Sequence, residues 1–282
     1  MIIQLASGDS ACSLLPLAGG SIGSWRVAGQ DMLRAATSQS DPLQAASFPL
    51  VPYSNRIANG RFEWNGQQIA LTPHPIAKPH SIHGVGWLQA WDVAESGAHF
   101  AVLRYAHDGD DHWPWPFLAE QRFKLGPDYL LVDLTAQNLA DEAVPLSFGH
   151  HPYFDSAGAS LRFTASGFCE NGDDNLPVSE AEVEGPRNFA LARPVGEQLF
   201  DNLFTNWNGM AKISWAGRAL GLLIKSNLPH AQLYVPQGQA FFCFEPVPHR
   251  TDAVNRNRAD MPVVLPGETF AASIRFSAVK AN

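Results

Sequence analysis

Alternation along the segment 129–138, YLLVDLTAQN, is the feature that most constrains how this chain can fold. In an extended chain successive side chains point to opposite sides, so the residues sort onto two faces. One face carries only apolar side chains, those of Leu130, Val132, Leu134 and Ala136. The other face carries Leu131, Asp133, Thr135 and Gln137. This pattern is typical of an antiparallel strand that is buried on one side and predicts a sheet with one covered face.

Several other segments favour strands. Residues 61–71 have apolar side chains on both sides of Asn65-Gly66, a pair that supplies the positive φ of a two-residue hairpin turn. Further strands are predicted at 100–106, 160–164, 240–244 and 272–279, the last as a closing strand, and one or two helical turns at 196–205. With 23 glycines and 21 prolines to end the strands, we expect an all-β protein. The fold is predicted to be a large antiparallel β-sandwich forming a single domain over residues 1–282.

The composition of the chain argues against several kinds of binding partner. The net charge is −8, and the start of the chain has no basic stretch followed by an apolar run. The acidic charge balance therefore predicts no nucleic-acid partner and no anionic-membrane partner, and the start of the chain predicts no signal peptide. No run of about 18 apolar residues is present, so no membrane span is expected. Cys12, Cys169 and Cys243 are too few and too widely spaced for a disulfide framework or a zinc site. A cytoplasmic location is the expectation.

Glu245 follows the apolar run 240–244 directly and precedes a proline. A carboxylate at the end of a buried strand is costly unless it is paired or functional. An apolar setting would raise its pKa toward that of a useful proton acceptor. The alternative is a glutamate that simply reaches solvent at a strand end.

Two pairs of histidines leave several interpretations open. His80 and His83 lie in a segment rich in glycine and proline, without acidic residues or cysteines at ligand spacing, so no metal site is predicted. His150 and His151 are adjacent, and in an extended segment they would point to opposite faces. Only one of them would then enter a given pocket, and the plain expectation is one buried and one exposed histidine.

The remaining polar and aromatic residues have both a structural and a functional interpretation. Asn55 and Arg56 precede the hairpin; the arginine is either solvated or directed at a polyol or carboxylate. The aromatic residues either line a cleft for the apolar face of a sugar ring or pack in the core. They include the run HWPWPF at 112–117, Trp87, Trp91 and Phe154.

Taken together, several segments resemble the aldose 1-epimerase (galactose mutarotase) family. They are NRIANGRF at 55–62, HSIHGVGW at 80–87, FGHHPYF at 148–154, DNLF at 201–204, AQLYV at 231–235, and the segment from Glu245 to residue 255. The chain differs from the family pattern at His150, where an asparagine is usual, at Pro152, and in the residues after Glu245. The resemblance implies a large antiparallel β-sandwich with a sugar cleft on one sheet.

The resemblance also implies roles for individual residues. Glu245 matches the family's catalytic base and His151 its proton-donating histidine, although His150 could compete for that role. The residues that match sugar-binding positions are Asn55, Arg56, His83, Asp201 and Gln232. No cofactor and no metal are implied, and the expected partner is an aldohexose.

The expected reaction is mutarotation, which opens a pyranose ring and closes it on the other face. Glu245 would remove the proton of the anomeric O1 hydroxyl while His151 protonates the ring oxygen. Three other functions stay open. They are a non-catalytic sugar-binding module, a glycoside-active enzyme, which would generally need a second carboxylate such as Asp201, and a sugar-phosphate epimerase, which would need Arg56 or Arg250 at the phosphate.

Overall fold

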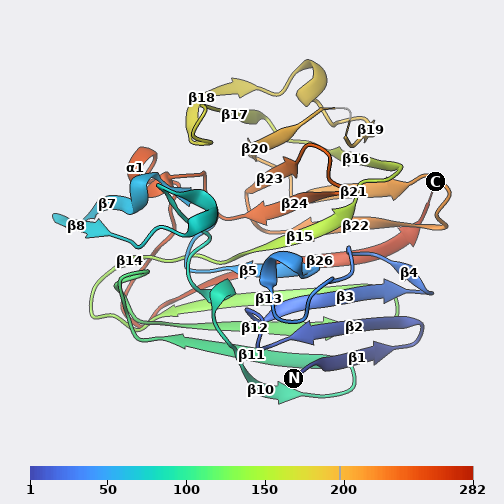
Figure 1. Ribbon diagram of the computed structural model, residues 1–282, viewed down its shortest axis with the longest axis horizontal. Coiled ribbons are helices and arrows are strands. Elements are labelled where there is room, and N and C mark those ends of the chain that lie inside the picture. The colour runs from blue at the N-terminus through green and yellow to red at the C-terminus, as the bar shows by residue number, and fades with distance from the viewer. Residues whose placement is uncertain (197, 282) are drawn as a thin grey trace.

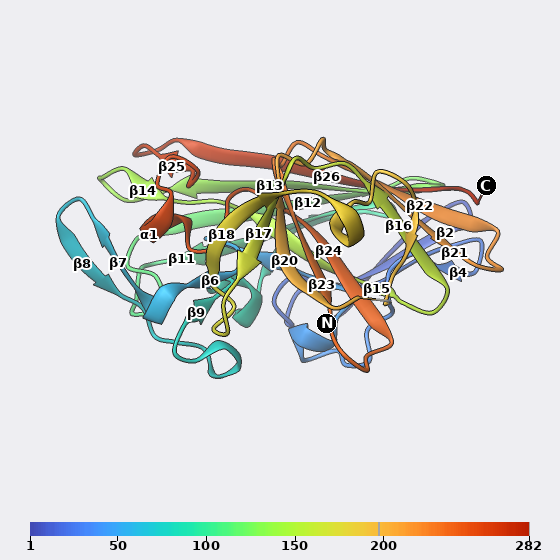
Figure 2. The same ribbon diagram turned by 90° about the horizontal axis from the view of Figure 1, so that it is seen from above.

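The computed structural model describes residues 1–196 and 198–281. Nearly all regular structure in these residues is antiparallel sheet, arranged as two large layers (Figures 1 and 2). Short strands also form three small two-stranded sheets beside the layers. The predicted all-β sandwich is therefore confirmed, whereas the single domain and the cytoplasmic location stay predictions.

The first layer has eleven strands within the described residues and carries the site discussed below. Its order is β1 (Ile3–Ser7), β2 (Ser10–Leu15), β3 (Ser21–Val27), β5 (Ser47–Leu50), β15 (Gly149–Asp155), β24 (Phe241–Val247), β23 (His230–Val235), β20 (Phe200–Thr205), β17 (Gly167–Asn171) and β18 (Pro177–Glu182), with β4 (Gln30–Asp31) paired to β3.

The second layer has nine strands among the residues described. Its order is β10 (Asp92–Ser96), β11 (Phe100–His107), β12 (Phe117–Leu125), β13 (Tyr129–Asn138), β26 (Thr269–Lys280), β22 (Leu220–Ser226), β21 (Met210–Trp215), β16 (Ala159–Phe163) and β19 (Arg193–Pro194). The strand predicted at 272–279 is thus interior, between β13 and β22, and does not close the sheet.

The remaining elements are short. The small sheets pair β6 (Arg56–Ile57) with β9 (Ser81–Ile82), β7 (Arg61–Trp64) with β8 (Gln67–Ala70), and β14 (Val144–Pro145) with β25 (Val263–Val264). Single 3₁₀ turns lie at Pro42–Gln44, Ala58–Gly60, Pro75–Ala77, Gly86–Leu88 and Gly185–Arg187. The α-helix α1 (Ala253–Arg256) has four residues, so no described helix is long enough to cross a bilayer.

The strand predictions follow the observed burial closely. In β13 the apolar face predicted from the alternation is fully buried, and the other face is half-buried. Asn65 and Gly66 form the hairpin turn between β7 and β8, with φ of 48° and 80°. The helical turns predicted at 196–205 are wrong where that segment is described, because Phe200–Thr205 form β20. Phe200, Leu203 and Phe204 are apolar enough to be buried on a strand with two covered faces.

The core between the two layers is rich in aromatic residues. Trp91, Trp113, Trp115, Phe117 and Phe154 belong to this core and are at least nine-tenths buried. Trp87 is equally buried but belongs to a second cluster, with Phe48 and Tyr153, on the cleft side of the eleven-stranded sheet. Neither these tryptophans nor Phe117 and Phe154 line the cleft described below, so the structural interpretation of these residues holds. Cys12, Cys169 and Cys243 are buried and free, and none is in a disulfide.

Candidate active site

A cleft of about 900 Å³ lies on the outer face of the eleven-stranded sheet, over β5, β15, β24, β23 and β20. All seven residues proposed from the sequence line it: Asn55, Arg56, His83, His151, Asp201, Gln232 and Glu245. They come from segments nearly two hundred residues apart, which the strand order brings together.

Strand register explains why these side chains are neighbours. In antiparallel sheets, residues directly opposite each other on adjacent strands point to the same face. Phe48 is opposite His151, and Glu245 is opposite Gln232. Tyr153 is opposite Cys243, and continuing that register by two residues sets His151 opposite Glu245. One row across the cleft floor therefore runs Phe48, His151, Glu245, Gln232.

A second row of side chains on the same face lies two residues further along each strand. Tyr153, Cys243, Tyr234 and Asp201 are successive partners across β15, β24, β23 and β20. The two rows place acidic, imidazole, phenol and amide groups on a floor that is otherwise apolar.

His151 and Glu245 are in direct contact at the centre of this floor. Their Nε2 and Oε1 atoms lie 3.3 Å apart, and both residues are more than nine-tenths buried. The imidazole stacks on Phe48, with ring centroids 4.5 Å apart and planes at 17°. The ring is therefore held by packing, and Nε2 is fixed beside the carboxylate.

Burial acts in opposite directions on the two groups. It raises the pKa of Glu245 well above its ordinary value, and the nearby charge of Asp201 adds to this effect. It lowers the pKa of His151 to about 3, with a further contribution from the charge of Arg34. Both shifts favour the uncharged form, so burial favours the pair with its single proton on Glu245 and a neutral imidazole at His151.

His150 points to the opposite face, as the alternation predicts. Its Nε2 lies 2.8 Å from Oε1 of Gln121 on the other sheet, and its Nδ1 accepts from the Ser47 hydroxyl. Gln121 Nε2 donates to the Gly20 carbonyl, which fixes the amide orientation. Both histidines of the pair are buried, so the expectation of one exposed histidine is wrong. His150 does not line the cleft.

The loop that carries Asn55 folds over the cleft and is joined to the loop of His83 by the β6–β9 pairing. The backbone N–H of Asn55 donates to His83 Nδ1 at 3.1 Å, and the His83 N–H donates to the Asn55 carbonyl at 3.0 Å. Both residues have positive φ, 57° and 60°, which directs their side chains toward the floor. Because Nδ1 is an acceptor, the neutral ring carries its hydrogen on Nε2.

A chain of polar contacts connects this loop to the sheet. Arg56 Nη1 donates to Asn55 Oδ1 at 3.3 Å and reaches Asp201 Oδ2 at 3.5 Å. Gln232 Nε2 donates to Asp201 Oδ1 at 2.8 Å. Asp201 thus accepts from both neighbours, although burial still raises its pKa.

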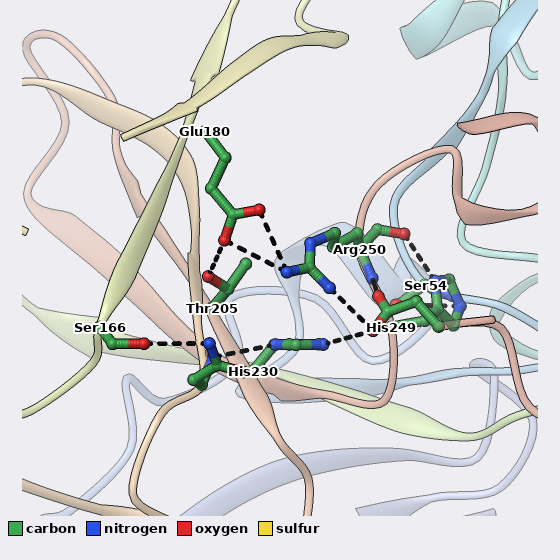
Figure 3. A network of polar contacts seen from close by, with 9 residues as sticks. Ser54, Ser166, Glu180, Thr205, His230, His249 and Arg250 are labelled. Atoms are coloured by element: carbon green, nitrogen blue, oxygen red, sulfur yellow. Dashed lines mark hydrogen bonds and ion pairs between the residues drawn. The ribbon is translucent and has the colours of Figure 1, made fainter. Parts of the chain in front are cut away.

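Figure 3 shows a second polar network, which contacts this loop at Ser54. The Ser54 N–H donates to His249 Nε2 at 3.3 Å, directly before Asn55. The next residue, Arg250, pairs with Asp260 and with Glu180 on β18. Arg250 is therefore used within the structure and does not line the cleft, which removes it as a phosphate ligand there.

Other sequence expectations have clear outcomes. His80 does not line the cleft; its Nδ1 accepts from the Asn59 N–H at 3.0 Å. Tyr153 and Phe48 were missed, although Tyr153 follows His151 by two residues and so had to share its face. No local pattern signals Arg34, which enters the cleft from the segment after β4.

Within the part of the chain that the structure describes, two groups of side chains have the spacing needed to hold a metal ion. Ligand atoms of His151, Cys243 and Glu245 lie within 4.8 Å of one another, as do those of the surface residues Asp110, Asp111 and His112. The first group includes the contact between His151 and Glu245, and burial raises the pKa of the Cys243 thiol well above its usual value. A thiol held in its protonated form is a poor ligand for zinc.

Comparison with known proteins gives a consistent result. The family model described as aldose 1-epimerase matches residues 1–277. YphB of Escherichia coli K12, an uncharacterised protein, is 30% identical over 265 residues, covering 89% of this chain and 90% of its own. Human galactose mutarotase is 27% identical over 262 residues, covering 77% of this chain and 74% of its own.

A solved structure is similar over the full length. The crystal structure of a candidate aldose 1-epimerase from Escherichia coli K12 superposes with a TM-score of 0.93 at 27% identity. It covers 100% of this chain and 99% of its own. The family match along nearly the whole chain agrees with the fold and with the cleft residues that it brings together. The chain therefore belongs to the aldose 1-epimerase family.

Proposed function

We propose that this protein is a mutarotase that interconverts the α and β anomers of an aldohexose. The observation that carries the proposal is the buried contact between His151 Nε2 and Glu245 Oε1, 3.3 Å apart on the floor of a polar cleft. Ring opening needs one group that accepts a proton and one that donates a proton, on either side of a single acetal carbon. An adjacent carboxylate and imidazole that share one proton meet this requirement.

The proton balance closes within the pair. The shared proton first moves from Glu245 to His151, whose Nε2 lies 3.3 Å from Oε1. Glu245, now a carboxylate, then accepts the proton of the O1 hydroxyl while His151 donates its proton to the ring oxygen and the C1–O5 bond breaks. The open form has an aldehyde at C1 and a hydroxyl at C5. After rotation about C1–C2, the C5 hydroxyl attacks the other face of the aldehyde. His151 recovers its proton from that oxygen, and Glu245 returns its proton to O1.

The other cleft residues hold the ring in this mechanism. His83 presents Nε2–H to a sugar oxygen, because its Nδ1 is occupied by the Asn55 N–H. Asn55, Arg56, Asp201 and Gln232 offer amide, guanidinium and carboxylate groups to the hydroxyls. The orientation of His150 toward Gln121 supports His151 as the donor.

A glycoside-active enzyme is less well supported. Such enzymes generally use two carboxylates that flank the reacting bond. The nearest ionisable partner of Glu245 is an imidazole, while Asp201 accepts hydrogen bonds from Arg56 and Gln232.

NMR exchange spectroscopy on equilibrated α and β anomers of glucose and galactose tests the proposal. Glu245→Gln removes the proton acceptor and should lower the exchange rate by about 10²–10⁴-fold. Glu95→Gln makes the same change at an exposed residue of β10 and serves as the control. Sugar binding without any exchange by the wild type would instead indicate a carbohydrate-binding protein. Near-normal exchange in both Glu245→Gln and His151→Asn would contradict the mechanism.

A further inference from the structure

The cleft extends past the acid–base pair to a cation that the proposed reaction does not use. This end is lined by Arg34, Phe241, Gln237 and Gln239. Arg34 lies 4.1 Å from the ring centroid of Tyr153 and 4.8 Å from that of Phe241. Tyr153 in turn lies 4.8 Å from the His151 ring, so a single aromatic ring separates the guanidinium from the imidazole.

Arg34 is held in place by carbonyl groups. Its Nη2 donates to the carbonyls of Ala45, at 2.9 Å, and Leu43, at 3.4 Å. No carboxylate among the described residues pairs with it, whereas Arg56 reaches Asp201. Asp155, the acidic residue lining this end, is already paired with Arg218 at 2.7 Å. Nε of Arg34 is buried without a partner, so part of its donor capacity is unused.

In the proposed binding mode, Arg34 lies near C6 of the sugar. With O1 at Glu245 and the ring oxygen at His151, C5 lies beyond the ring oxygen, away from Glu245. C5 carries C6. Arg34 lies nearer to that side: its carbonyl partners lead directly into β5, the strand that flanks His151 opposite β24. Its guanidinium is closer to Tyr153 of β15, at 4.1 Å, than to Phe241 of β24, at 4.8 Å. Arg56, in contrast, reaches Asp201 on β20, two strands beyond β24.

The available charge matches one negative charge at C6. A guanidinium fork binds a carboxylate with two parallel hydrogen bonds. A phosphate monoester carries about −1.5 to −2 charges at pH 7 and needs further cations. The other groups at this end are neutral amides, aromatic rings and Asp155, whose charge is paired with Arg218, so Arg34 offers one cation to a singly charged group.

We propose that Arg34 selects hexoses that carry a single negative charge at C6, such as hexuronates, over neutral hexoses. This inference rests on the proposed mutarotase function and adds the substrate class. Arg34 would act on substrate binding, through KM, and leave the proton transfers to Glu245 and His151.

The test compares anomer exchange of glucuronate and galacturonate with that of glucose, galactose and glucose 6-phosphate. We expect the wild type to have at least a tenfold higher kcat/KM for a hexuronate than for the matching neutral hexose. In Arg34→Gln this preference should fall by roughly 10- to 100-fold, mainly through KM, as expected for a lost charge-assisted hydrogen bond. Arg34→Lys keeps the charge without the fork and should be intermediate.

The preference is a ratio of two substrates on one preparation, so it does not depend on the fraction of a variant that folds. Arg104→Gln removes an exposed arginine of β11 on the other sheet and should leave the ratio unchanged. Equal losses for both substrates in Arg34→Gln, a wild type that prefers neutral hexoses, or a preference for the 6-phosphate would overturn the inference. Absence of exchange with every sugar would instead overturn the proposed function itself.

Discussion

The two faces of β15 at His150 and His151 differ in how completely their polar groups are satisfied. On the inner face His150 uses both ring nitrogens, with Ser47 and Gln121 as partners. On the outer face His151 contacts Glu245 through Nε2, while its Nδ1 is buried without a partner. Adjacent residues of one strand thus have different tasks. The satisfied histidine joins the two sheets, and the incompletely satisfied one is available for chemistry.

Other residues that line the cleft also have buried polar atoms without a hydrogen-bond partner. Buried side-chain atoms without a hydrogen-bond partner include Arg34 Nε and Gln232 Oε1, and both residues line the cleft with His151. A fully satisfied group has nothing left to offer a ligand, whereas unused donors and acceptors can bind one. Ser81 Oγ and Trp113 Nε1 are exceptions, since both are buried without a partner and neither residue lines the cleft.

The largest expected effect is on catalysis at His151. His151→Asn should lower the rate of anomer exchange by about 10²–10⁴-fold, because the proposed proton donor is lost. The unfolding free energy should change by no more than about 1 kcal/mol, since one ring nitrogen already has no partner. NMR exchange and urea denaturation measure the two effects. His99→Asn, an exposed histidine, is the control. If His151→Asn lost much stability but kept normal anomer exchange, His151 would be a structural residue and the functional assignment of the outer face of β15 would be wrong.

His150 should show the opposite behaviour. His150→Leu leaves the Ser47 hydroxyl and the Gln121 amide buried without their partner. It should therefore lower the unfolding free energy by about 2–4 kcal/mol. Exchange per folded molecule should stay within about threefold of the wild type. Adding Gln121→Leu should restore part of the stability, and a strictly additive double variant would show that the contact carries no coupling.

The contrast also predicts how stability depends on pH. Burial lowers the pKa of His150 to about 3, compared with 6.5 in an unfolded chain. Between these values the unfolded chain binds one proton more than the folded protein. Stability is therefore fully present above pH 6.5 and declines as the pH falls toward 3. Each such histidine contributes a slope of up to about 1.4 kcal/mol per pH unit. Urea midpoints between pH 7 and pH 4.5 should fall less steeply in His150→Leu than in the wild type; equal slopes would contradict this account.

The smallest effect is expected at Trp113. Trp113→Phe removes a buried N–H that has no partner, which offsets part of the lost packing. The unfolding free energy should fall by about 1 kcal/mol or less. The KM for sugar should not change, because Trp113 does not line the cleft. A clear change in KM, measured by progress curves at several sugar concentrations, would show that an unsatisfied core group can also influence the site.

Much of the fold could be predicted from the sequence because a half-buried strand has alternating apolar and polar residues, which are visible in a short segment. The period-two alternation at 129–138 gave both the strand and its buried face, and Asn65-Gly66 gave a turn. The prediction of helical turns at 196–205 failed because a short apolar stretch does not distinguish a helical turn from a strand buried on both faces. The position of β26 also could not be predicted, since strand order depends on pairings between distant segments.

The residues of the candidate site could be predicted where they lie in short sequence motifs that match the family, as around Asn55, His83, His151 and Glu245. By itself the sequence determined that His150 and His151 face opposite ways, because the direction of side chains in a strand is a local property. Only the tertiary structure decided which face is the cleft and which is the core, and only it placed Arg34 beside Tyr153. The physical reason is that burial and electrostatic environment depend on which strands and loops pack together, and residues far apart in the chain determine that packing.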